Sequence, residues 1–147
     1  DMLGESRFSG LWKTEFGASK KDQELMSKIE EVINGIRAVY RPFALAVNSH
    51  QPTDTLITKI ILGTFGCLPA CDRYFIDGFK SSGFSYSYLN RNFVERALRF
   101  CQENLQELRE EQERIMRVSK VHYPLMKLVD MYFWQIGFDK EKLKLDK

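Results

Sequence analysis

Residues 58–75 read TKIILGTFGCLPACDRYF, and this stretch decides how the rest of the chain is interpreted. Its first half is an apolar, helix-like run that contains a single charged residue, Lys59. A glycine-punctuated turn with Pro69 follows, and Asp72 then opens the next apolar segment. Because burying an ionisable side chain is costly, Lys59 and Asp72 need a structural or a chemical reason to be there.

Helical periodicity continues upstream of this stretch. Apolar residues recur at three- and four-residue steps and predict an amphipathic helix that begins near Ser19 and ends before Pro42. The residues that carry this period are Leu25, Ile29, Val32, Ile33, Ile36 and Tyr40. A loop then leads to Thr53 or Asp54, either of which can cap a helix that runs to about Leu62.

The downstream half is also predicted to be helical. A short helix follows Asp72 and ends in the serine- and glycine-rich segment 81–85. One long amphipathic helix is expected over 89–118, and a last helix over 125–136 that Gly137 stops. The last helix is apolar nearly all round and therefore belongs in the core. With no convincing strand pattern, the fold is predicted to be all-α.

Length and composition bound the domain organisation and the class of protein. We expect an irregular N-terminal arm over residues 1–19 and a single all-α domain over 20–147. The formal charge of +2 does not by itself indicate a nucleic-acid binder. No apolar run approaches the roughly 18–20 residues that span a bilayer, and three cysteines without a signal-peptide pattern favour a cytoplasmic protein.

Two segments carry a resemblance to a known family. The run TKIILGTFGCLPACDRYF resembles the region of helix-hairpin-helix DNA glycosylases, and of their small bacterial relatives, in which a lysine-bearing helix leads through a turn to an aspartate at the start of another helix. Residues 123–137, YPLMKLVDMYFWQIG, are similar to the closing helix of such proteins. The resemblance implies an all-α enzyme that flips a damaged or modified base out of DNA and hydrolyses its glycosidic bond, in repair or in phage defence.

The resemblance also implies roles for individual residues. Asp72 would be the catalytic carboxylate, which stabilises the positive charge that develops on the sugar and orients the attacking water. Lys59 would be the Schiff-base nucleophile of a bifunctional enzyme. The residues expected to contact the substrate are Phe65, Arg73, Tyr74 and Phe75, with the rings stacking on the extruded base.

Structural roles for the same residues stand beside these catalytic ones. Asp72 follows a turn and opens a helix, so it fits an N-cap that accepts backbone N–H bonds. Lys59 fits a snorkelling lysine with its stem on apolar neighbours and its ammonium in water. Asp130, inside the apolar last helix, requires a partner such as Arg73 or Lys127, which favours a structural salt bridge.

A second enzyme class rests on a different pair of residues. Arg117 and His122 have the Arg-x4-His spacing of HEPN ribonucleases, four-helix bundles that carry this pair near the start of their last helix. The resemblance implies that the arginine stabilises phosphate charge and that the histidine assists proton transfer from the ribose 2′-hydroxyl of RNA.

Other kinds of site have weaker signals. Cys67, Cys71, Cys101 and His122 could supply four zinc ligands, but the usual Cys-x2-Cys spacing is absent and free cysteines commonly behave as small buried apolar residues. Residues 63–66 lack the length and the Lys-Ser/Thr end of a phosphate-binding loop. We therefore predict no metal and no cofactor. A non-catalytic helical interaction module, with Lys59 and Asp72 in purely structural roles, is the remaining alternative.

Overall fold

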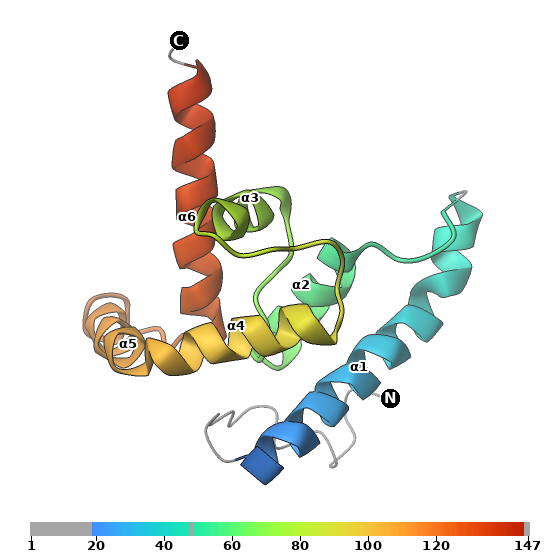
Figure 1. The fold of residues 1–147 in the computed structure, drawn as a ribbon, viewed down its shortest axis with the longest axis horizontal. Coiled ribbons are helices and arrows are strands. Elements are labelled where there is room, and N and C mark those ends of the chain that lie inside the picture. Colours follow the sequence, from blue (N-terminus) through green and yellow to red (C-terminus); the bar gives the residue numbers. More distant parts are fainter. Residues whose placement is uncertain (1–18, 48, 146–147) are drawn as a thin grey trace.

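The computed structural model describes residues 19–47 and 49–145, so nearly all of the predicted N-terminal arm lies outside this part of the chain. The described residues form helices and no strand, which confirms the all-α prediction (Figure 1). In chain order the helices are α1 (Ser19–Ala46), α2 (Asp54–Thr64), α3 (Arg73–Ser81), α4 (Arg91–Glu103), α5 (Leu105–Ser119) and α6 (Leu125–Leu145).

Helices α3 and α6 cross in very close contact through two glycines. A Cβ atom built on Gly78 would lie 1.8 Å from the carbonyl oxygen of Phe133, and one built on Gly137 would lie 2.0 Å from that of Tyr74. The prediction that Gly137 stops the last helix is therefore wrong: α6 continues past it to Leu145. Gly137 is needed here because only a residue without Cβ lets the two backbones approach so closely.

Phenylalanine rings fill the core beside this crossing. The rings of Phe75 and Phe79 on α3 stack with centroids 5.5 Å apart, and Phe133 on α6 meets them edge-on at 5.6 and 5.0 Å. Phe93 on α4 meets both α3 rings edge-on. All four rings are buried, so this cluster joins α3, α4 and α6.

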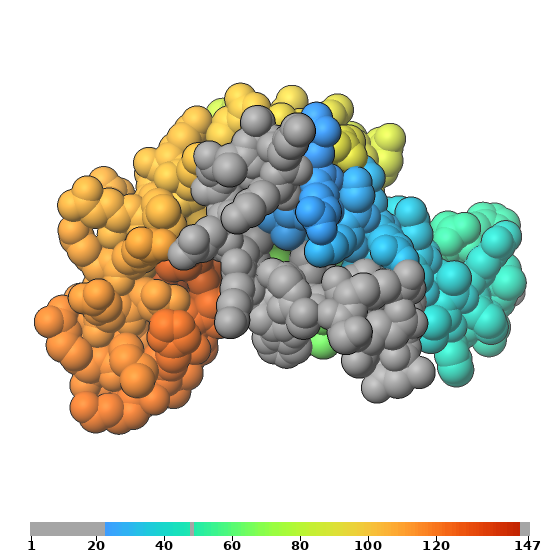
Figure 2. Space-filling view, turned by 90° about the horizontal axis from the view of Figure 1, so that it is seen from below, coloured from blue at the N-terminus to red at the C-terminus, as the bar shows by residue number. Residues whose placement is uncertain are grey.

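Helix α1 packs its predicted apolar stripe against α2 and α4, but it is longer than predicted. The helix continues through Pro42 to Ala46 instead of ending before the proline. Pro42 cannot donate to the carbonyl of Ala38, but both residues are exposed, so water can satisfy that group. The C-terminal end of α1 projects away from the other helices (Figure 1), and in Figure 2 it and α5 lie at opposite ends of the visible face.

The segment that connects α3 to α4 is fixed by one carboxylate. Asp54, the first residue of α2, accepts hydrogen bonds at Oδ2 from the hydroxyl of Tyr86 and from the backbone N–H of Leu89, each at 2.7 Å. Arg37 of α1 donates to the carbonyl of Leu89 at 3.0 Å and lies 3.8 Å from Asp54 Oδ1. Three elements therefore depend on Asp54 for their relative positions.

The single long helix predicted over 89–118 is two helices. Asn104 leaves the helical conformation (φ −110°, ψ 21°), and its side-chain amide donates to the carbonyl of Phe100 at 2.8 Å. An asparagine that bonds its own backbone in this way competes with the helix, and the chain changes direction between α4 and α5 (Figure 1). Helix α5 has no buried residue and ends at Ser119, and the C-cap residue Lys120 has a left-handed backbone conformation (φ 61°).

Within the residues that the structure describes, no helix combines the length and the apolar character that crossing a bilayer requires.

Candidate functional site

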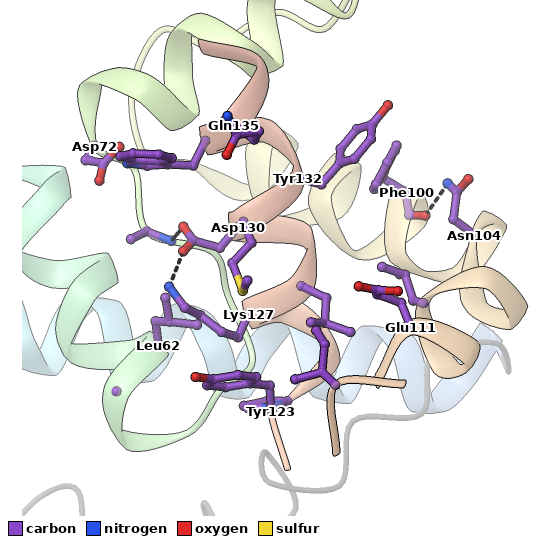
Figure 3. Close-up of a pocket in the computed structure, with 18 of the residues that line it drawn as sticks. Leu62, Asp72, Phe100, Asn104, Glu111, Tyr123, Lys127, Asp130, Tyr132 and Gln135 are labelled. Carbon is purple, nitrogen blue, oxygen red and sulfur yellow. Dashed lines mark hydrogen bonds and ion pairs between the residues drawn. The ribbon is translucent and has the colours of Figure 1, made fainter. Parts of the chain in front are cut away.

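A groove of about 1290 Å³ opens between α2, α5 and α6, next to the C-terminal end of α4 (Figure 3). Its walls mix apolar, aromatic and charged side chains. Both Lys59, from α2, and Asp72, at the start of α3, are among the residues that line it. The structure thus brings together the two residues that the sequence singled out. The other charged residues of the lining are Glu107, Glu111, Lys127 and Asp130.

Asp72 combines a structural role with a place at this groove. It is the N-cap of α3, with an extended backbone (φ −86°, ψ 175°), and its Oδ1 accepts the backbone N–H of Phe75 at 3.0 Å. The predicted capping role is therefore confirmed. The side chain is only half-buried, so capping leaves the carboxylate beside the recess.

The turn that leads to Asp72 is buried and tightly held. The backbone N–H of Cys71 donates to Thr58 Oγ1 at 2.8 Å, and that of Ala70 donates to Asp130 Oδ1 at 3.0 Å. Upstream, Gly66 is left-handed (φ 65°), and a Cβ atom there would lie 2.5 Å from Cγ of Pro124. The glycine in this turn is thus required both by its backbone conformation and by the proline that packs on it.

Asp130 has the salt-bridge partner that one of the two sequence alternatives named. Its Oδ2 lies 2.7 Å from Lys127 Nζ, and its side chain is 6% exposed against 36% for the lysine. Figure 3 shows this pair on α6 at the wall of the groove. Arg73, the other alternative, instead pairs with Glu141 at 2.5 Å and lies over the ring of Tyr74. The structural interpretation of Asp130 is confirmed with Lys127 as its partner.

Lys59 is exposed on α2 although its neighbours in the sequence are apolar. The adjacent residue Thr58 is fully buried, so these two neighbouring residues of α2 face the core and the groove, respectively. This exposure agrees with the snorkelling interpretation. It also leaves the ammonium group accessible from the groove.

The rings expected to stack on a base are not at the groove. Phe65 and Phe75 are 3% and 0% exposed and belong to the core, so neither face is open to a ligand. Tyr74 is half-buried and packs edge-on against Trp134 at 5.1 Å and Phe138 at 5.5 Å. The stacking expected of Phe65 and Phe75 is therefore wrong, because both rings belong to the core. Tyr74 and Arg73 are not among the residues that line the groove, and Arg73 pairs with Glu141 on α6.

Other rings line the groove and were missed from the sequence. They are Phe100 from α4, Tyr123 before α6, and Tyr132 and Trp134 on α6. Tyr132 is 51% exposed, and its ring stacks on Phe100 with centroids 5.7 Å apart. The sequence did contain a signal for them, because residues 132–134 are three consecutive aromatic residues. On a helix such neighbours point in different directions, so some of these rings enter the core and others reach the surface.

The charges of the groove are unevenly distributed. Helix α5 contributes Glu107 and Glu111, one helical turn apart, while the opposite side contributes Lys59 and the lysine of the Lys127–Asp130 pair. The side-chain hydrogen bond from Arg114 holds the pKa of Glu111 below its usual range. The α5 side of the groove thus carries two carboxylates, and Arg114 offsets the charge of Glu111. The α2 side carries Lys59, while Asp130 offsets the charge of Lys127.

Arg117 and His122, the alternative catalytic pair, are both exposed and are not among the residues that line the groove. His122 Nε2 lies 3.4 Å from the side-chain nitrogen of Gln112, and Gln112 donates to the carbonyl of Tyr123 at 2.5 Å. These contacts connect the end of α5 to the start of α6.

The cysteines are buried free thiols. Desolvation raises the pKa of Cys67 and Cys71 to about 12 and that of Cys101 to about 11, so these thiols stay protonated near neutral pH. His122, the fourth residue of the zinc hypothesis, is exposed while the thiols are enclosed. Within the described part of the chain, no three His, Cys, Asp or Glu side chains are grouped so as to hold a metal ion.

Comparisons of the chain with protein-family models, with curated proteins and with solved structures give no match.

Proposed function

We propose that this chain excises a base from DNA, with Asp72 as the catalytic carboxylate. The observation that supports the proposal is the shared groove: Lys59 and Asp72 come from different elements and line the same recess together with Tyr123, Tyr132 and Trp134. A glycosylase needs a carboxylate beside a recess that admits an extruded base, and rings on which that base stacks.

The position of Asp72 supports this role. The N–H of Phe75 fixes Oδ1, and the buried turn before Asp72 fixes the backbone, so the carboxylate keeps one orientation relative to the groove. When the bond between C1′ and the base breaks, its electron pair leaves on the base and positive charge develops on the sugar. The fixed carboxylate stabilises that charge and orients the water that attacks C1′.

Lys59 determines whether the enzyme is also a lyase. In its amine form, Nζ adds to C1′ in place of water, and loss of a proton from nitrogen with opening of the sugar ring gives a Schiff base. Borohydride reduces this adduct and traps the protein on DNA. Trapping that disappears in Lys59→Ala while base release continues would show that Lys59 forms the adduct and that water replaces it as the attacking group in base release.

The test is base release from a panel of duplexes that carry alkylated, oxidised or deaminated bases or modified phage bases, with free base measured by mass spectrometry. Asp72→Asn is the informative variant because asparagine also caps helices well, so α3 is retained. We expect release to fall about 100-fold or more. Asp77→Asn, on the same helix but outside the groove lining, is the matched control and should release base like wild type.

Undiminished release by Asp72→Asn contradicts the proposed role of this residue. Structured RNA in the same panel tests the ribonuclease alternative. Cleavage of that RNA, lost in Arg117→Ala or His122→Ala, would replace the DNA proposal.

The acidic wall of the groove favours a second candidate function, a non-catalytic docking module. Glu107 and Glu111 lie on a helix without buried residues, and the exposed side chain of Met131 lines the same groove. Such a wall suits a partner with a basic, apolar face. An inactive protein that binds a basic amphipathic peptide, and loses the peptide in Glu107→Lys, would support this candidate.

A further inference from the structure

The fully enclosed polar side chains gather at a single turn. Among the residues whose burial the structure describes, the buried polar or charged ones are Thr58 (0% exposed) and Asp130 (4%). Thr58 accepts the backbone N–H of Cys71 at 2.8 Å, and Asp130 accepts that of Ala70 at 3.0 Å. Both therefore bind the two residues that come immediately before Asp72, one from α2 and the other from α6.

A carboxylate is a costly way to satisfy one backbone amide. A neutral side chain would accept the N–H of Ala70 equally well, whereas a buried carboxylate also requires a cation. Lys127 supplies that cation at 2.7 Å, and Lys127 lines the groove. Asp130 thus connects the turn, through the N–H of Ala70, to the ammonium group of Lys127.

A continuous chain of hydrogen bonds leads from this pair to Asp72. Lys127 bonds Asp130, Asp130 bonds the N–H of Ala70, and the carbonyl of Ala70 accepts the N–H of Asp72 at 2.9 Å. On the other side, Thr55 Oγ1 donates to the carbonyl of Cys71 at 2.7 Å. The backbone just before Asp72 is therefore held from α6 and from α2.

We infer that Asp130 is a positioning residue for Asp72 and acts through Ala70; this inference rests on the proposed function. Without the carboxylate, the N–H of Ala70 loses its acceptor inside the core, and the turn must shift to find another. A displacement of about 1 Å at a reacting group lowers turnover about 100-fold, with little effect on binding. The expected signature is a loss of kcat at nearly constant KM.

Three variants separate positioning from general stability. Asp130→Ala removes both bonds, while Asp130→Asn keeps an oxygen for Ala70 and loses only the charge that faces Lys127. Val129→Ala is the matched control, because Val129 is its neighbour on α6, is fully buried and lies outside the groove lining. We expect kcat to fall about 100-fold in Asp130→Ala and less than about tenfold in Asp130→Asn, with wild-type kcat in Val129→Ala.

A second measurement does not depend on activity. Amide hydrogen exchange at Ala70 and Phe75 reports the bond to Asp130 and the bond to Asp72 Oδ1, respectively. Asp130→Ala should accelerate exchange at both amides more than at other core amides, and Val129→Ala should not. If the wild type releases no base, the proposed function fails, while exchange still decides whether Asp130 holds the turn.

Two results would overturn the inference: equal losses of kcat in Asp130→Ala and Val129→Ala, or unchanged exchange at Ala70 and Phe75. Should Asp130→Ala fail to fold, the double variant Asp130→Leu with Lys127→Met replaces it. This variant removes the acceptor of Ala70 without leaving a lone buried charge. The same exchange measurement then applies, with Lys127→Met alone as its reference.

Discussion

Substitution of Gly78 by alanine tests the crossing of α3 and α6 directly. The new Cβ would meet the carbonyl oxygen of Phe133 at 1.8 Å, and ordinary contact begins at 3.4 Å, so the backbones must separate by about 1.6 Å. The obstacle is a backbone atom and cannot rotate away. The separation also opens the packing of Phe75 and Phe79 on Phe133, all of which are fully buried.

The expected cost follows from these contacts. A radial gap of about 1 Å already forfeits up to about half of the dispersion energy of a contact. For three rings we expect a loss of about 3–4 kcal/mol, which exceeds the gain of about 1 kcal/mol that alanine brings to a helix interior. The net free energy of unfolding should therefore fall by about 2–3 kcal/mol. With an m value of about 2 kcal/mol per M, the urea midpoint drops by about 1–1.5 M.

Circular dichroism in urea measures this shift, and the chain provides its own control. Gly63 lies in α2, where a Cβ would meet nothing within 4 Å. Gly63→Ala should stabilise the protein by about 0.5–1 kcal/mol through helix propensity alone. A Gly78→Ala variant that is as stable as Gly63→Ala would refute the close crossing.

Three further predictions concern stability and its dependence on pH. Asp54→Ala, which leaves the N–H of Leu89 without its acceptor, should lower the free energy of unfolding by about 2–3 kcal/mol in urea titrations. Lys120→Gly should raise it by about 1 kcal/mol, because glycine adopts the left-handed conformation without strain; an unchanged midpoint would argue against strain at this site. Burial raises the pKa of Cys67 and Cys71 from 9.0 to about 12, so the native state keeps protons that the unfolded chain releases. The stabilisation from these two protonated thiols should therefore be fully present below about pH 9, and it should fall by about 1.4 kcal/mol per thiol and pH unit as the pH rises towards 12. Urea midpoints measured from pH 8 to 10 check this. The slope of stability against pH should be smaller in Cys67→Ala.

The parts of the fold that the sequence predicted are those decided by local chemistry. Thr53 caps α2 through a bond to the N–H of Leu56, and Asp72 caps α3, as the sequence indicated. Lys127 and Asp130 are three residues apart on one helix, so their pairing follows from helical geometry alone. Each of these features depends on neighbours within one turn.

The parts that were missed depend on tertiary partners. Gly137 signals the end of a helix unless a second glycine lies opposite, and no local pattern reveals Gly78 in that position. The break at Asn104 interrupts a stripe whose period continues on both sides. Helical period also does not distinguish a face that lines a groove from one that enters the core, which is why Phe75 was assigned to the site and Trp134 was not.

The absence of buried residues in α5 gives the groove two walls of unequal stiffness. Helices of this kind have few interactions to lose, so they open locally at a small fraction of the global unfolding free energy. The wall formed by α2 and α6 is anchored in the core, and its amides should exchange with solvent only when the whole domain unfolds. We therefore expect α5 to adjust when the groove is occupied, while the wall formed by α2 and α6, and the carboxylate of Asp72 with it, keeps its position.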